Sequence, residues 1–329
     1  MPKLPTHNPS LSFIKENWNG NLLNEKQQYI NLDGPAEKSF AELLKWQTEK
    51  NPLKPEKKKQ RTIIDVVTNH HITNNREDGI VWLGHASFLF TISGKHFITD
   101  PVLYNVGPVK RFTPLPCDAA ALKHIDYILL SHNHRDHCDQ KSMQQLCALN
   151  PTAIILTGLN IAPLLRSWKI ANPIIEAGWY QRYNIETDVV ITYLPAKHWN
   201  RRGLADMNNM LWGSFMIEGN KNKIYFGADS GLGIHFADIA QLFPGIDIAL
   251  LGIGAYKPEW FMASAHTSPA DALVAFDQLK AKQFIPMHHG TFDLSDEPIF
   301  YPKHELLLLQ EQQGISNVEH LSIGYKLQW

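Results

Sequence analysis

The densest group of metal-binding side-chain types in this chain is the segment His132-x-His134-x-Asp136-His137. It directly follows the apolar run Tyr127–Leu130, which reads as a buried strand. Side chains alternate along extended chain, so His132 and His134 point to the same side. Asp136 and His137 stand where the chain turns toward a helix, so they can face a second point nearby. The spacing predicts a metal-binding segment rather than a loop of surface histidines.

Three single residues, His198, Asp229 and His288, each follow a further predicted strand. Alone each is a weak signal, but loops at strand ends on a rigid sheet are where sites are built. Their shared position therefore predicts that they join the histidine segment. A set made only of imidazoles and carboxylates suits zinc, with manganese or iron as alternatives.

Composition agrees with imidazole as the ligand. The 329 residues include 16 histidines but only 3 cysteines, which argues against a disulfide scaffold and against a cysteine-rich zinc module. The formal charge of −1 gives no basic excess, so we expect no nucleic-acid partner. The start of the chain lacks the pattern of a signal peptide, and the few cysteines favour a cytoplasmic location. Peripheral membrane contact stays open.

The first sixty residues differ in their sequence pattern from the rest of the chain. A helix is predicted near Ala36–Glu49, followed by the proline- and lysine-rich stretch Pro52–Lys59, which reads as a solvated linker. We therefore expect residues 1–60 to form an N-terminal extension that packs on a main domain of residues 61–329. The extension carries no apolar pattern that indicates a membrane-docking element.

From Ile80 onward, short β-rich runs alternate with helical patterns, which predicts an α/β protein with layered sheets and helices. The predicted strands are Ile80–Leu83, Ser87–Ile92, His96–Thr99, Tyr127–Leu130, Ala153–Leu156, Val189–Leu194, Trp212–Ile217, Lys223–Phe226, Ile248–Leu251 and Gln283–Pro286. The predicted helices are Asp139–Leu149, Ala162–Trp168, Phe236–Leu242 and Pro269–Leu279.

These ligand motifs, in this order, resemble the metallo-β-lactamase fold hydrolases over about Ile80 to Leu308. Short motifs around these ligands make the resemblance more specific: they are similar to the branch that contains N-acyl-phosphatidylethanolamine-hydrolysing phospholipase D. Those motifs are Gly84-His85-Ala86-Ser87, Thr99-Asp100-Pro101, Ser131-His132-Asn133-His134, Lys197-His198-Trp199-Asn200-Arg201-Arg202 and His288-His289-Gly290-Thr291-Phe292.

The resemblance implies an αββα four-layer sandwich with two divalent metal ions per chain and a metal-bridging hydroxide as the nucleophile. It implies one ion held by His132, His134 and His198. The other would be held by Asp136, His137 and His288, with Asp229 bridging the two.

Five further residues are candidates near this centre. In the family an acid at the place of Asp100 supports the ligand loop by hydrogen bonds, and we expect that role here. Arg201 and Arg202 can offer guanidinium groups to a phosphate. His85 is a candidate for lining the substrate site or for bonding a backbone carbonyl. His266, which precedes a predicted helix, is a candidate for catalytic proton transfer beside Asp136 and Asp229.

The resulting hypothesis is a binuclear metal-dependent hydrolase, most simply a phosphodiesterase of the phospholipase D type. The substrate would be a phospholipid or another small molecule, and a homodimer stays open. The first alternative is a lactonase or other ester hydrolase acting on a soluble, phosphorylated or unphosphorylated small molecule. The second is a di-iron oxidoreductase, which His134 and the lack of a flavin domain disfavour.

Overall fold

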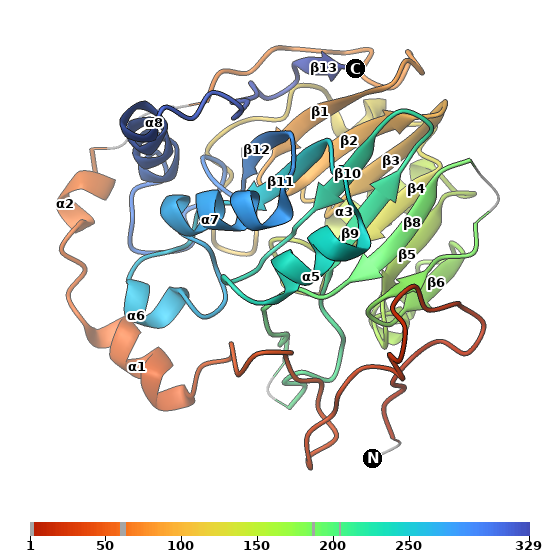
Figure 1. The fold of residues 1–329 in the computed structure, drawn as a ribbon. Coiled ribbons are helices and arrows are strands. Elements are labelled where there is room, and N and C mark those ends of the chain that lie inside the picture. Colours follow the sequence, from red (N-terminus) through yellow and green to blue (C-terminus); the bar gives the residue numbers. More distant parts are fainter. Residues whose placement is uncertain (1–2, 60–63, 186–187, 204) are drawn as a thin grey trace.

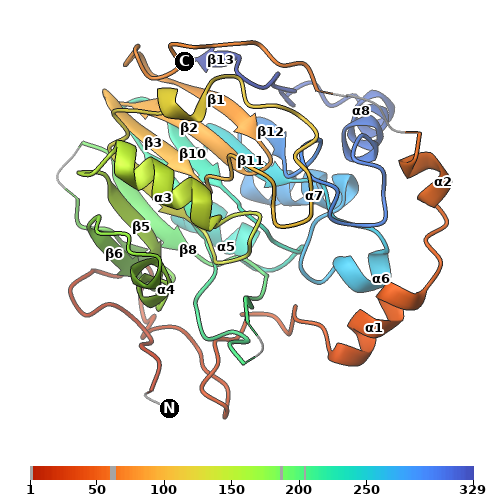
Figure 2. The same ribbon diagram turned by 180° about the vertical axis from the view of Figure 1, so that it is seen from behind.

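The computed structural model describes residues 3–59, 64–185, 188–203 and 205–329, and in them two β-sheets lie face to face. Helices cover the outer face of each sheet (Figure 1). Seen from behind, α3 and α4 lie over one sheet, and in the first view α5 and α7 lie over the other (Figure 2). The protein is thus the αββα sandwich expected from the sequence.

Among the described residues, the first sheet has seven strands in the order β13-β1-β2-β3-β4-β5-β6. Its strands are β1 Gly79–Gly84, β2 Ser87–Ile92, β3 Lys95–Thr99, β4 Tyr127–Leu130, β5 Ile154–Gly158, β6 Ile174–Ala177 and β13 Lys326–Gln328. The turn between β2 and β3 places Ser93 at φ 50° and Gly94 at φ 72°. Two consecutive left-handed residues match the twist of a tight hairpin, which explains the Ser-Gly pair. From β3 to β6 the strands run parallel.

The second sheet has six strands in the described residues, in the order β12-β11-β10-β9-β8-β7. Its strands are β7 Gln181–Arg182, β8 Val190–Leu194, β9 Ser214–Glu218, β10 Lys223–Phe226, β11 Ile248–Gly252 and β12 Gln283–Met287. Strands β10, β11 and β12 run parallel, so their carboxyl ends meet at one edge.

Helices join the strands and carry their own sequence signals. They are α1 Phe40–Thr48, α2 Lys54–Lys57, α3 Gln140–Leu149, α4 Ala162–Ser167, α5 His235–Leu242, α6 Glu259–Met262, α7 Pro269–Leu279 and α8 Tyr301–Gln313, with a 3₁₀ turn at Ala119–Ala121. Asp139 caps α3 by accepting a hydrogen bond from the Ser142 N–H, as predicted. Ser268 and Asp271 form a capping box at the start of α7, where Pro269 occupies the first turn.

The main hydrophobic core fills the space between the two sheets. Trp82 and Phe88 from the first sheet meet Tyr193, Phe215 and Phe226 from the second, and all five are fully buried. A second cluster lies between the first sheet and α3, where β1 and β2 contribute the other faces of their strands. Burial on both faces explains why these strands read as continuous apolar runs.

The N-terminal segment runs along the ends of the sheets and contributes α1 and α2 to one flank of the molecule (Figure 1). The Asn8 N–H and the Asn8 carbonyl both bond the side chain of Gln181, and Phe13 forms an isolated bridge with Gln181. Within the stretch expected to be a solvated linker, four residues form α2, and most of the stretch is exposed to solvent. Lys57 of α2 pairs with Asp293 at 2.5 Å. The proposed boundary between residues 60 and 61 lies outside the described residues.

The described helices do not include one with the length and apolar character needed to cross a bilayer. The three cysteines are buried free thiols.

Candidate metal centre

Each predicted ligand lies just beyond the carboxyl end of a strand. The histidine segment follows β4, and His198, Asp229 and His288 follow β8, β10 and β12. The chain turns sharply at two of these points, because Ala228 has φ 51° and His288 has φ 61°. Such left-handed residues are rare outside glycine, and they persist where the surrounding structure holds them. Here they turn Asp229 and His288 toward the site.

The first group of ligand atoms brings His132, His134 and His198 together around one point. Nδ1 of His134 lies 3.0 Å from Nε2 of His132 and 3.0 Å from Nε2 of His198. Asp229 Oδ2 approaches the same point, 3.9 Å from His132 Nε2 and 3.7 Å from His198 Nε2. Four potential ligand atoms therefore converge, and all lie within 4.8 Å of one another.

The second group gathers Asp136, His137 and His288 beside the first. Asp136 Oδ2 lies 3.6 Å from His137 Nε2 and 3.5 Å from His288 Nε2. Asp229 reaches both histidines, at 3.1 Å from each Nε2 atom. Asp229 is thus the residue shared by the two groups, which is the position that the sequence analysis assigned to it.

Three of the ligand histidines have a partner for the ring nitrogen that faces away from the two groups, whereas His134 Nε2 and His288 Nδ1 have none among the described residues. His198 Nδ1 donates to the carbonyl of Ala265 at 3.0 Å, and His132 Nδ1 lies 2.8 Å from Ser131 Oγ. His137 Nδ1 lies 2.8 Å from Asp100 Oδ2. Partners of this kind fix the orientation of each ring and leave the opposite nitrogen to face a cation.

Asp100 holds several groups of the ligand loop in place through its carboxylate. It is fully buried, and its carboxylate accepts hydrogen bonds from the Ser131 N–H at 2.7 Å and the Ser131 hydroxyl at 2.5 Å, besides the contact with His137. Burial raises the pKa of Asp100, and the bonds from His137 and Ser131 oppose that effect. Asp100 therefore lies behind the ligand loop, in the place expected of a supporting acid.

The electrostatics of the site are those of carboxylates surrounded by imidazoles. Burial alone would raise the pKa of Asp229, but the imidazoles of His137, His288 and His266 hold it well below the ordinary range. Burial lowers the pKa of His134 to about 4, whereas the facing carboxylates outweigh burial at His288 and raise its pKa to about 9. The buried carboxylates therefore favour the protonated, positively charged form of the His288 ring that faces them.

This donor set fits a divalent cation. Two groups of imidazole nitrogens and carboxylate oxygens converge in a buried place, and ring nitrogens face each other at 3.0 Å. Metal binding needs neutral imidazole and ionised carboxylate, which the lowered pKa values of His132, His198 and Asp136 provide. The facing carboxylates raise the pKa values of His137 and His288, so a cation would have to displace a proton from each of these two rings. Oxygen and nitrogen donors of this kind suit zinc, manganese or iron.

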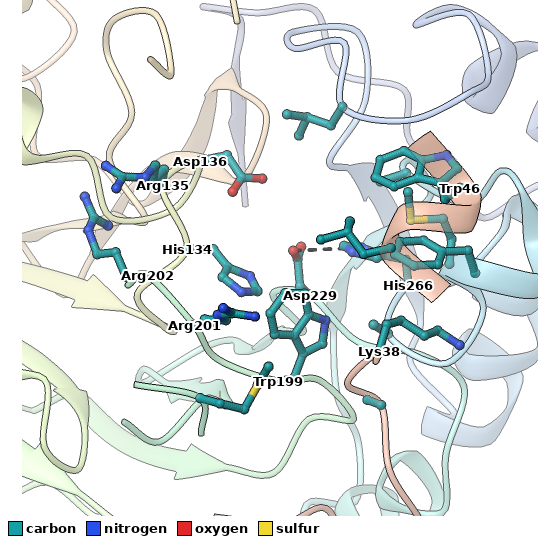
Figure 3. Close-up of a pocket in the computed structure, with 18 of the residues that line it drawn as sticks. Lys38, Trp46, His134, Arg135, Asp136, Trp199, Arg201, Arg202, Asp229 and His266 are labelled. Atoms are coloured by element: carbon teal, nitrogen blue, oxygen red, sulfur yellow. Dashed lines mark ion pairs between the residues drawn. The ribbon is translucent and has the colours of Figure 1, made fainter. Parts of the chain in front are cut away.

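A cavity of about 350 Å³ opens onto these groups (Figure 3). Its lining has three parts: ligand residues, an apolar wall from α1 and α6, and basic side chains. The lining includes His134, Asp136, Asp229, His266 and His288; Phe40, Leu43, Trp46, Phe261 and Met262; and Lys38, Arg135, Arg201 and Arg202. Trp46 stacks on Phe261 at 4.8 Å, so the wall joins the N-terminal segment to the main domain. The site is an anion-attracting centre beside an apolar surface.

The remaining candidate residues take distinct positions. Arg201 and Arg202 line the cavity, but Arg202 Nη1 also donates to the carbonyls of Asn133 and Cys138, and so it braces the histidine segment. His266 lines the cavity with Nδ1 3.8 Å from Asp229 Oδ2. His85 is buried and is not among the residues that line the cavity, and neither of its ring nitrogens bonds a backbone carbonyl of the described residues. Its Nε2 lies 3.2 Å from Asp136 Oδ2, within the second group of potential ligand atoms beside Asp136, His137 and His288.

Sequence reasoning assigned no role to Lys38 and Arg135 of the cavity lining, nor to two further parts of this site. One is Ser131, which links Asp100 to His132; its position directly before the histidine segment is the signal that could have indicated it. The other is the contribution of α1 to the cavity wall. Its helix was predicted, but a helix pattern alone does not indicate which surface it covers.

Comparison with known proteins agrees with the fold. The profile of the beta-lactamase superfamily domain matches residues 95–289. The N-acyl-phosphatidylethanolamine-hydrolyzing phospholipase D 1 of Caenorhabditis elegans is 28% identical over 99% of this chain and 98% of its own length. The mitochondrial N-acyl-phosphatidylethanolamine-hydrolyzing phospholipase D of Saccharomyces cerevisiae is 32% identical over 72% of this chain and 52% of its own. A metallo hydrolase of Ignicoccus hospitalis has a similar structure, with a TM-score of 0.59 and 20% identity over 76% of this chain and 97% of its own.

The fold and the ligand groups thus define a metal-dependent hydrolase. The chain belongs to the beta-lactamase superfamily and is related to the phospholipases D that hydrolyse N-acyl-phosphatidylethanolamine.

Proposed function

We propose that this protein is a binuclear phosphodiesterase of the N-acyl-phosphatidylethanolamine phospholipase D type. The observation that carries the proposal is one cavity in which the two ligand groups, a basic rim and an apolar wall meet. A phospholipid carries an anionic phosphodiester next to long apolar chains, and this cavity offers a surface for each part. The end-to-end similarity to the Caenorhabditis elegans enzyme supports the same substrate class.

In this proposal the ligand groups divide between two cations in the way that the family resemblance implies. The first cation would be held by His132, His134 and His198, and the second by Asp136, His137 and His288, with Asp229 serving both. Two divalent cations at such a site supply activation of water at neutral pH and neutralisation of charge that develops on phosphate oxygens.

The other polar residues would bind and orient the substrate. Arg201 and Arg202 lie at the cavity and would attract the phosphate anion, although one nitrogen of Arg202 is already committed to main-chain carbonyls. His266 would face the leaving group, because its ring lines the cavity beside Asp229. Burial lowers the pKa of His266 to about 4, so its ring is neutral at neutral pH and would contact the leaving group through a hydrogen bond.

The apolar wall would bind the acyl part of the substrate. Phe40 is 75% exposed and also lines the cavity, and Leu44 on the same helix is 51% exposed. Exposed apolar side chains at a cavity mouth are suited to contact with a lipid surface. Although the sequence of this segment carries no pattern of a membrane-docking element, these exposed side chains lead us to include peripheral membrane contact in the proposal.

A substrate panel tests the proposal. We expect the metal-loaded protein to hydrolyse N-acyl-phosphatidylethanolamine and the simple diester bis(p-nitrophenyl) phosphate, and to leave lactones intact. Asp229→Asn should abolish hydrolysis of both phosphodiesters. Turnover of lactones alone would favour the ester-hydrolase alternative and refute the phosphodiesterase assignment.

A further inference from the structure

Asn31, from the N-terminal segment, forms two hydrogen bonds with the main chain of the predicted metal ligand His198. Its side-chain Nδ2 donates to the carbonyl of His198 at 2.8 Å, and its Oδ1 accepts from the N–H of His198 at 3.1 Å. Oδ1 also accepts from the indole N–H of Trp212 at 3.2 Å. Asn31 is 7% exposed, so these bonds are made in a buried place where unpaired polar groups are costly.

The position of His198 in the chain explains why its main chain needs these hydrogen bonds. Strand β8 ends at Leu194, so the His198 peptide groups lie beyond the sheet ladder that would otherwise pair them. One amide side chain bonds the peptide groups on both sides of the His198 Cα atom. The ring is held separately, through Nδ1 and the carbonyl of Ala265. The place of Nε2 in the first ligand group therefore depends on two contacts, one of which comes from the N-terminal segment.

The same segment also contacts a second ligand loop. Asp33 accepts from Lys197 Nζ at 3.4 Å and from the N–H of Ile234 at 3.1 Å. Lys197 precedes His198, and Ile234 lies in the loop that follows Asp229. Residues 31–33 thus tie the loop after β8 to the loop after β10.

We propose that Asn31 is a positioning residue of the metal centre: its amide fixes the main chain of His198 so that Nε2 meets His132 and His134. The N-terminal segment is then a part of the metal site as well as a wall of the cavity. This inference rests on the metal centre proposed above. Removing a hydrogen-bonding partner of a metal ligand commonly lowers metal affinity by about 10- to 100-fold.

The test compares two buried asparagines of the same segment. Asn31→Ala removes the two hydrogen bonds to the main chain of His198, and Asn21→Ala removes one bond to a main chain outside the site, because Asn21 Oδ1 accepts from the main-chain N–H of Trp179 at 3.0 Å. Trp179 belongs to neither ligand group. Zinc affinity of the full chain is measured by competition with a chromogenic chelator, and urea unfolding of the metal-free chain is measured in parallel.

We expect both variants to lose stability without metal, Asn31→Ala the more because it loses three hydrogen bonds, and only Asn31→Ala to bind one zinc ion about 10- to 100-fold more weakly. Unchanged zinc affinity in Asn31→Ala would overturn the inference. An equal loss in Asn21→Ala would also overturn it, since the effect would then come from general destabilisation.

Asn31→Asp decides the question even where Asn31→Ala fails to fold. The aspartate keeps an acceptor for the His198 N–H but loses the donor to the His198 carbonyl. Its added negative charge would by itself favour cation binding. Weaker zinc binding by this variant would therefore report lost positioning, and wild-type or tighter binding would refute it. Because the readout is zinc affinity, failure of the phosphodiesterase assignment would leave the result interpretable.

Discussion

Replacing Asp100 by asparagine should weaken metal binding, although Asp100 is not itself one of the predicted ligands. Oδ1 of Asp100 accepts from the Ser131 N–H, whereas Oδ2 accepts from the Ser131 hydroxyl and faces His137 Nδ1 at 2.8 Å. In Asp100→Asn the retained oxygen can keep the first bond, so the new NH₂ group faces His137 Nδ1. Two donors cannot bond each other, and the ring must then place its proton on Nε2, the nitrogen that points at Asp229.

The magnitude follows from the bonds that are lost. Hydrogen bonds to a charged group contribute about 1.5–3 kcal/mol. That range corresponds to about 10- to 100-fold in equilibrium binding, which matches the usual cost of removing a partner behind a metal ligand. We expect Asp100→Asn to bind one zinc ion more weakly by this factor, and to lose hydrolysis at limiting zinc by a similar factor.

The assay is zinc competition with a chelator, with Thr99→Val as the matched control. Thr99 is the buried neighbour of Asp100, and its hydroxyl donates to the carbonyl of Ala86 at 2.9 Å without contacting the ligand groups. Thr99→Val should lower the free energy of unfolding but leave zinc affinity unchanged. Wild-type zinc affinity in Asp100→Asn, or an equal loss in Thr99→Val, would refute the reasoning.

Two further predictions concern substrate selection and acid stability. Leu43→Gln should raise KM for an N-acyl phospholipid by about 10-fold, since burying a leucine contributes about 1.5–3 kcal/mol, and it should spare bis(p-nitrophenyl) phosphate. The control is Leu307→Gln, an exposed leucine on α8 outside the cavity lining, and equal effects of the two variants would count against the apolar wall. Burial lowers the pKa of His235 to about 3, so the unfolded chain takes up a proton below pH 6.5 that the folded chain refuses, and stability falls as pH falls. Urea unfolding of chelator-treated protein should show about 2 kcal/mol less loss between pH 7 and pH 5 in His235→Gln than in the unaltered chain, and an identical loss would contradict the assignment.

The sequence was most informative where one residue pattern is tied to one structure. Continuous apolar runs predicted the buried strands, and the signals at Ser268 and Pro269 predicted α7 with the bounds observed. By contrast α8 was not predicted, because only Pro302 and Leu306 among its residues are buried, which leaves a weak apolar stripe. Strand β13, of composition Lys-Leu-Gln, carries no β signal and depends on pairing with β1.

In the site, too, the residues that belong to a local sequence pattern could be predicted, and those that act through distant contacts could not. The predicted ligand residues do converge in space, because the short spacing and the shared position after strands carry that information within the chain. Asn31 was beyond sequence reasoning, since an amide that bonds main-chain groups 167 residues away leaves no local pattern. The stretch Pro52–Lys59 was read as a solvated linker because lysine runs usually are, and the contact of Lys57 with Asp293 is a tertiary feature.

Metal stoichiometry tests the central claim most directly. Elemental analysis of the purified, zinc-loaded chain after removal of unbound metal should find close to two ions per chain, because two groups of ligands share Asp229. Finding one ion or none would contradict the binuclear centre.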